Sequence, residues 1–174
     1  MTAPWQRSFP AFAGPGIAHP SNSLRVSDGE AASILAKLAT SAWSAPVHIG
    51  AGRHAGYTIR HAREASTTAL FSAERIVGFY AGSYLWIAGK HRGIGLSTPL
   101  ILAAAEQRGG TIMPPGVVLQ GYTPAGLAAH RAAHTHAVLT ALARGVEVPP
   151  AVRQELETPG YPATHTDQPG TITC

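Results

Sequence analysis

The most informative segment of the chain reads WIAGKHRGIGLST and covers residues 86–98. An apolar run that ends at Ile87 leads into a glycine-rich turn, and the turn leads into an apolar segment with helical character. At such a junction, successive backbone N–H groups lie at the positive end of the helix dipole, where they bind phosphate or pyrophosphate. Glycines let the backbone approach the oxygens because no Cβ intervenes. The segment therefore predicts an anion-binding turn between a strand and a helix.

Two common phosphate-binding patterns do not fit this turn. The Walker pattern requires a Lys directly after its last glycine, and Leu96 follows Gly95 here. The dinucleotide-binding pattern requires a third glycine, where this chain has Thr98, and an acidic residue about 20 positions later. No acidic residue lies between Glu106 and Glu147. A third class of phosphate site is therefore indicated.

The segments before the turn predict antiparallel β-structure. Short β-rich runs are separated by connections of only a few residues, which is typical of hairpins. The predicted strands cover residues 57–61, 67–71, 75–80 and 83–88, with further short strands at 23–26 and 116–120.

Three helices are predicted, over residues 28–42, 99–108 and 124–143. Ser27 and Glu30 have the spacing of a capping box, which marks the start of the first helix. Thr98 is the predicted cap of the second helix, and its nearly uniform apolar character indicates burial against a sheet.

Both ends of the chain are rich in proline and lack periodicity. Residues 1–21 contain four prolines and predict an N-terminal arm without regular structure, either an extended N-terminal arm or a docked segment. Residues 149–174 contain five prolines and predict a tail rich in Pro and Thr. Residues 22–148 between them are the predicted globular domain.

Residues 92–97 read RGIGLS, which resembles the R/Q-x-x-G-x-G/A signature of the GNAT family of N-acetyltransferases. The preceding RIVGF at residues 75–79 is similar to the third strand of that family, where an apolar pair commonly precedes a glycine. The resemblance is best over residues 66–110. It implies an α/β fold with a mixed, mostly antiparallel central sheet flanked by helices.

The resemblance also implies that acetyl-CoA binds as a co-substrate. Backbone amides of residues 93–98 would hold the pyrophosphate, and the strand backbone around Leu85 and Ile87 would pair with pantetheine, as extended ligands pair with strand edges. Arg92 would either contact phosphate or order the turn. The cofactor-binding residues expected in this way are Leu85, Trp86, Ile87, Arg92, Gly93, Ile94, Gly95, Leu96, Ser97 and Thr98.

The tyrosine that the family often places in the helix after the next strand is missing from residues 124–143. His130 and His134 share the inward stripe of this helix and are candidate acids or bases, because imidazole transfers protons near neutral pH. The alternative is that both are hydrogen-bonded core residues. Tyr122 is a further candidate on the thiolate side. Tyr84 and Trp86 share a strand face and either line an acceptor pocket or pack in the core.

The histidine pair has the spacing of a metal site, but no Glu or Cys accompanies it, and no metal is predicted. The chain has 174 residues and a formal net charge of +4, which favours anionic partners. Lys and Arg form no dense run, so a dedicated nucleic-acid binder is not indicated. A single cysteine, Cys174, excludes an internal disulfide, and no apolar run reaches the ~18 residues of a membrane span.

We therefore expect a cytoplasmic enzyme that transfers an acetyl group from acetyl-CoA to a primary amine. The acceptor is a small amine, an amino acid, a peptide terminus or an aminoacyl-tRNA. The alternative is an acyl-CoA-binding regulatory or interaction module without catalysis. RNA binding without CoA ranks last. The proline-rich ends could reach across a homodimer, which the sequence leaves open.

Overall fold

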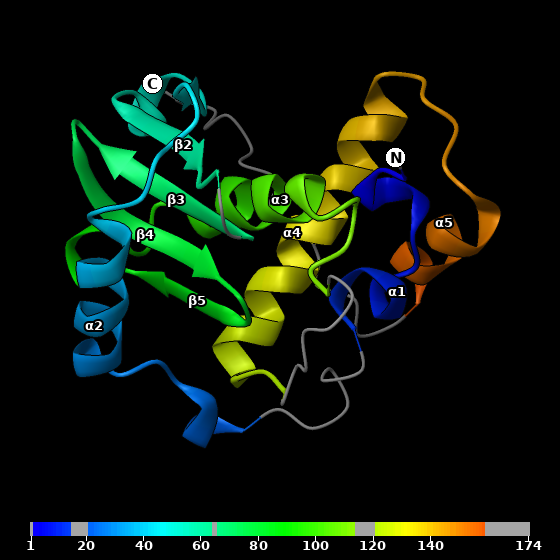
Figure 1. Ribbon diagram of the computed structural model, residues 1–174. Coiled ribbons are helices and arrows are strands. Elements are labelled where there is room, and N and C mark those ends of the chain that lie inside the picture. The colour runs from blue at the N-terminus through cyan, green and yellow to red at the C-terminus, as the bar shows by residue number, and fades with distance from the viewer. Residues whose placement is uncertain (1, 15–20, 64–65, 114–120, 159–174) are drawn as a thin grey trace, which may run out of the picture.

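The structure is a computed structural model that describes residues 2–14, 21–63, 66–113 and 121–158. Within these residues the strands form one antiparallel sheet in chain order (Figure 1). The strands are β1 (Val47–His48), β2 (Tyr57–His61), β3 (Thr67–Ser72), β4 (Arg75–Ala81) and β5 (Tyr84–Ile87). The predicted hairpins over residues 67–88 are confirmed, because short connections leave β4 beside β3 and β5 beside β4. The strand expected at 116–120 lies outside the described residues.

Helices cover both faces of the sheet (Figure 1). One face packs against α2 (Asp28–Leu38) through Phe71 and Phe79. The opposite face packs against α3 (Ser97–Gln107) through Leu70 and Tyr80. The helix α4 (Pro124–Ala143) lies against α3. Adjacent residues of β3 and β4 point to opposite faces, so both faces of these central strands are buried. The predicted α/β class is confirmed.

Local signals placed two helix starts correctly and one incorrectly. The Ser27 Oγ accepts from the Glu30 N–H at 3.2 Å, and the Glu30 carboxylate accepts from the Ser27 N–H at 2.8 Å, so the capping box is confirmed. Thr123 caps α4. Thr98 is not a cap, because α3 already begins at Ser97. The first helix is also shorter than predicted and ends at residue 38.

The prediction of an arm without regular structure is wrong at residues 4–6 and 9–13, where the segment is docked and not extended. This segment forms η1 (Pro4–Gln6) and α1 (Phe9–Ala13), and the side chains of Phe9 and Phe12 are buried. The prolines start these short helices instead of preventing them, because the first turn of a helix does not need their missing N–H. In Figure 1 the segment lies beside α4, on the side away from the sheet.

Two further expectations are corrected. Residues 23–26 do not form a strand, because η3 (Asn22–Leu24) occupies this segment. The predicted tail begins with α5 (Pro150–Glu157), whose Val152 is buried with Val138 of α4. Residues 159–174 lie outside the described residues. Two more short helical turns, η4 (Gly52–His54) and η5 (Gly89–His91), border the glycine-rich turn.

None of the helices in the described segments has both the length and the apolar character needed to cross a bilayer.

Candidate functional site

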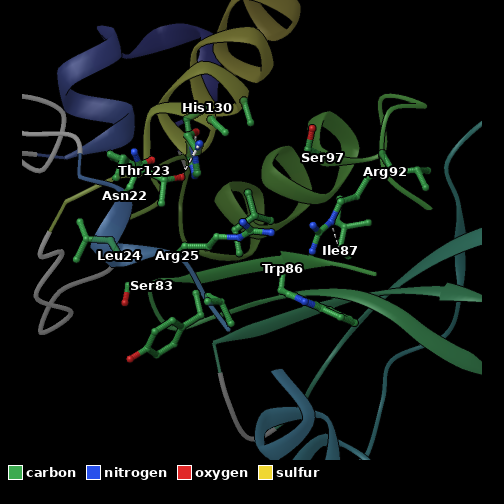
Figure 2. A pocket seen from close by; sticks show the side chains of 18 of the residues that line it. Asn22, Leu24, Arg25, Ser83, Trp86, Ile87, Arg92, Ser97, Thr123 and His130 are labelled. Atoms are coloured by element: carbon green, nitrogen blue, oxygen red, sulfur yellow. Dashed lines mark hydrogen bonds between the residues drawn. The ribbon is translucent and has the colours of Figure 1, made fainter. Parts of the chain in front are cut away.

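A cavity of about 460 Å³ opens along β5, between the η3 segment and the first turns of α3 and α4 (Figure 2). Most of the residues predicted from the sequence line it. They are Tyr84, Leu85, Trp86, Ile87, Arg92, Gly93, Gly95, Leu96, Ser97, Tyr122 and His130. Three predicted residues, Ile94, Thr98 and His134, are not part of the lining. The cavity therefore brings together the strand, the turn and the start of the helix.

The strand β5 borders the cavity with an edge that no other described strand covers. The Ala88 N–H donates to the Val77 carbonyl at 2.9 Å, and the register pairs Trp86 with Phe79 and Leu85 with Tyr80. Hydrogen-bonded and non-bonded pairs alternate in an antiparallel ladder. The backbone groups of residues 85 and 87 therefore point away from β4, toward the open edge.

Glycines allow the turn its backbone conformation. Gly93 has φ +79° and Gly95 has φ +81°, a region that residues with a Cβ rarely adopt. A Cβ placed on Gly93 would meet no atom within 4 Å, so the requirement there is conformational and not a matter of space. The turn thus leaves open room at Gly93, whereas a Cβ on Gly95 would contact the His54 side chain at 3.7 Å.

Side chains from distant parts of the chain hold the turn in place. The Arg92 Nε donates to the Ile87 carbonyl at 2.6 Å, which ties the turn to the end of β5 (Figure 2). His54 bonds the Ile94 carbonyl through Nε2 at 2.7 Å, and the Tyr57 hydroxyl bonds His91 Nδ1 at 2.8 Å. Sequence reasoning did not identify His54, Tyr57 or His91, because 40 and 34 positions separate the two bonded pairs.

The start of α3 offers unsatisfied donors beside the turn. Leu96 is the N-cap residue, and its side chain makes no capping hydrogen bond. The first N–H groups of a helix have no intrahelical partner, so those of Ser97 and Thr98 remain available. The arrangement has the geometry of an anion-binding helix start.

The charge of the cavity also favours an anionic ligand. Two arginines, Arg25 and Arg92, line the cavity, and no Asp or Glu is found among its described lining residues. Guanidinium groups form strong, directional hydrogen bonds with carboxylates and phosphates. The cavity is therefore suited to an anionic ligand. Arg25 was not identified from the sequence, because it belongs to a segment that was interpreted as a short strand.

His130 lies at the cavity wall with both ring nitrogens engaged. Nδ1 lies 2.6 Å from the Gly126 carbonyl and Nε2 lies 2.9 Å from the Tyr80 hydroxyl. Because a carbonyl only accepts, Nδ1 carries the proton, and Nε2 accepts from Tyr80. Burial lowers the pKa of His130 to about 4, although the Gly126 bond opposes the shift. The ring is therefore neutral near pH 7, and a proton-transfer role would require one of these bonds to break.

Of the other candidates for proton transfer, Tyr122 is engaged, His134 lies outside the cavity, and Tyr84 lines the cavity but is largely exposed. The Tyr122 hydroxyl donates to the Ala13 carbonyl at 2.6 Å, and burial raises the pKa of Tyr122. His134 lies outside the cavity, where its Nε2 bonds the Arg7 carbonyl at 2.8 Å. Tyr84 is 47% exposed. The Trp86 ring stacks on Phe79 at 5.5 Å in the core beneath α2, which agrees with the core-packing interpretation.

Comparison with protein-family models, curated proteins and solved structures finds no match for the chain. Within the described residues, no group of three or more His, Cys, Asp and Glu side chains could hold a metal ion.

Proposed function

We propose that the cavity binds acetyl-CoA and that the protein transfers the acetyl group to a primary amine. One observation carries the proposal. The open edge of β5 runs directly into the glycine turn and the uncapped start of α3, and all three border a single cavity. A ligand with an extended amide-containing arm and a pyrophosphate matches this order of features, since strand edges bind extended chains and helix starts bind phosphate.

The residues present fit such a ligand. The Leu85 N–H and carbonyl and the Ile87 N–H face the open edge, while the Ile87 carbonyl is already taken by Arg92. Arg92 therefore orders the turn, which is one of the two roles that the sequence suggested. The amides of residues 93–98 would receive the pyrophosphate, since the backbone is open at Gly93 and the helix start is positive.

The thioester of acetyl-CoA supplies an activated acyl group for the reaction. The amine nitrogen forms a bond to the acyl carbon, the carbon–sulfur bond breaks, the amine loses a proton and the sulfur gains one. We assign to the chain mainly the positioning of the two reactants and hydrogen bonding to the oxygen that gains charge. His130 and Tyr122 already have partners, so the acceptor would react as the neutral amine.

The hydrogen bonds that engage His130 and Tyr122 favour a second candidate function, binding of acyl-CoA without catalysis. A protein that binds acyl-CoA as a signal or a structural ligand would need the strand edge and the turn, but no free acid or base. Release of free CoA thiol in the presence of an amine separates the two. Binding without thiol release from any amine would support the binding module.

The first experiment measures thermal stability with and without millimolar acetyl-CoA. A ligand at ~100 times its dissociation constant adds ~2.7 kcal/mol to the free energy of unfolding. For a chain of this size, that corresponds to a rise of about 5–10 °C in the Tm. The matched variants are Ser97→Asp and Ser97→Asn. Ser97 is the first residue of α3 and lines the cavity.

The two variants have nearly the same shape and differ in charge. A carboxylate at a helix start stabilises the unliganded helix but repels a phosphate. We therefore expect S97D to fold normally and to lose the acetyl-CoA shift, while S97N keeps most of it. An unchanged Tm of the wild-type protein with acetyl-CoA, or an equal shift in S97D and S97N, would overturn the proposal.

A further inference from the structure

The η3 end of the cavity has features that the acetyl-CoA arrangement does not use. Arg25 and Asn22 line this end, together with Ser83 at the start of β5. Figure 2 shows Arg92 and Ser97 on one side of the cavity and Asn22, Leu24 and Ser83 on the other, with the Arg25 side chain extending from the second side toward the middle.

The guanidinium group of Arg25 has no partner within residues 2–14, 21–63, 66–113 and 121–158. Among the described residues, no hydrogen bond or ion pair engages it, and the ion pair that is formed joins Arg60 and Glu74. The Arg25 backbone is held, because its N–H donates to the Asn22 carbonyl at 3.3 Å. A fixed backbone thus presents an unpaired cation to a cavity whose described lining contains no carboxylate.

The position of Arg25 separates it from the phosphate-binding turn. The turn follows the Ile87 end of β5, whereas Arg25 lies with Ser83 at the beginning of the strand. A pantetheine arm that starts at the turn and follows the strand edge would bring the acyl group toward Leu85, at the side from which Arg25 extends. The charge of Arg25 would therefore face the acceptor and not the pyrophosphate.

We propose that Arg25 binds the anionic group of the acceptor, which is a primary amine carrying a carboxylate, as in a free amino acid. This inference rests on the proposed function. The planar guanidinium matches a carboxylate with two parallel hydrogen bonds. A polycationic acceptor would instead be repelled by two arginines at close range. The described lining of the cavity contains no acidic residue to offset this repulsion.

The experiment compares matched acceptors at saturating acetyl-CoA. A panel of neutral amino acids is tested beside their carboxamides and the corresponding decarboxylated amines, with release of CoA thiol as the readout. Rates are referred to the concentration of neutral amine at each pH, because the three kinds of compound differ in amine pKa. The protein variants are Arg25→Gln and Arg25→Lys. Arg25 is exposed and unpaired, so both should fold.

In the wild-type protein we expect kcat/KM for the amino acid to exceed that for its amide by about ten- to a hundredfold, the size of a charged hydrogen-bonded contact. In R25Q this preference should fall to within about threefold through a higher KM for the amino acid, and R25K should recover part of it. The Tm shift with acetyl-CoA should be the same in R25Q as in the wild-type protein.

Four outcomes overturn the inference. The first is equal kcat/KM of the wild-type protein for amino acids and their amides, and the second is a preference for the amino acid that R25Q retains. The third is acetyl-CoA binding without acetyl transfer to any carboxylate-bearing amine. The fourth is loss of the Tm shift with acetyl-CoA in R25Q. The last would assign Arg25 to the co-substrate. The proposed function itself fails separately, through the absence of any acetyl-CoA shift in the wild-type protein.

Discussion

His130 and His134 lie one turn apart on the same face of α4, yet they belong to two different regions of the molecule. His130 lines the cavity and bonds Tyr80. His134 bonds the Arg7 carbonyl and lies 5.7 Å from the Phe9 ring and 5.2 Å from the Phe12 ring, measured between centroids. The comparison teaches that a helical stripe does not define one surface. The segment that covers each turn determines whether the turn borders a cavity or the core.

The two regions share a buried apolar cluster and are also joined by a hydrogen bond. The Tyr122 hydroxyl, at the cavity wall, donates to the carbonyl of Ala13 in the N-terminal segment. The segment that buries His134 therefore also fixes one wall of the cavity. Three predictions test how far the two regions can be separated.

The largest effect is expected at the covered end of α4. Phe12 is fully buried, so Phe12→Ala should lower the free energy of unfolding by about 3–5 kcal/mol. Chemical denaturation measures the loss. The acetyl-CoA shift should persist at a temperature where the variant is folded, because Phe12 does not line the cavity.

The control for this variant is Leu142→Ala, also near the far end of α4 but 38% exposed. Its loss of stability should be much smaller, because exposed side chains leave no cavity when they are truncated. Equal losses in the two variants would show that the N-terminal segment does not pack as described.

The second prediction concerns the pH dependence of stability. In the unfolded chain His130 takes up a proton below its usual pKa of 6.5, whereas in the folded protein burial lowers that pKa to about 4. Between these values the unfolded state binds more protons. The stabilising contribution of neutral His130 to the free energy of unfolding is therefore fully present above pH 6.5. It falls as the pH drops toward 4, by about 3 kcal/mol in total.

Denaturation between pH 4 and 7 measures this slope. In His130→Gln the slope should become flatter, although some should remain because burial also lowers the pKa of His134. His136→Gln, an exposed position on the same helix, is the control and should keep the wild-type slope. A slope in H130Q equal to that of the wild-type protein contradicts the buried, neutral state of His130.

The smallest effect is expected at the cap of α4. The Thr123 Oγ1 accepts from the Gly126 N–H at 2.9 Å, and Thr123→Ala should lower the free energy of unfolding by about 1 kcal/mol. Ser27→Ala, which removes the cap of α2, should cost a similar amount. Because Thr123 lines the cavity and Ser27 does not, only T123A should also weaken acetyl-CoA binding in a titration. Equal affinities in both variants would place the ligand away from α4.

Much of the candidate site could be predicted because its signals are local. Gly93 and Gly95 mark a backbone with positive φ, and the run of aromatic and aliphatic residues marks β5 as a strand. The direction in which the Leu85 and Ile87 backbone groups point then follows from the antiparallel pairing of neighbouring strands. Prediction failed where prolines were interpreted only as helix breakers, since Pro10 in α1 occupies the first turn.

The chemistry of single side chains could not be predicted in the same way. Spacing placed His130 and His134 on one stripe, but Tyr80 and Arg7, which are their partners, lie 50 and 127 positions away. The unpaired state of Arg25 likewise depends on which carboxylates come near it in space.

The amino-acid sequence alone determined the hairpins, the glycine turn and the capped start of α2, because each depends on contacts within a few residues. The folded chain was needed to bury the N-terminal segment, to engage both nitrogens of His130 and to leave Arg25 unpaired beside a cavity. Those features depend on desolvation and on contacts between distant segments, and neither is encoded in any local pattern of residues.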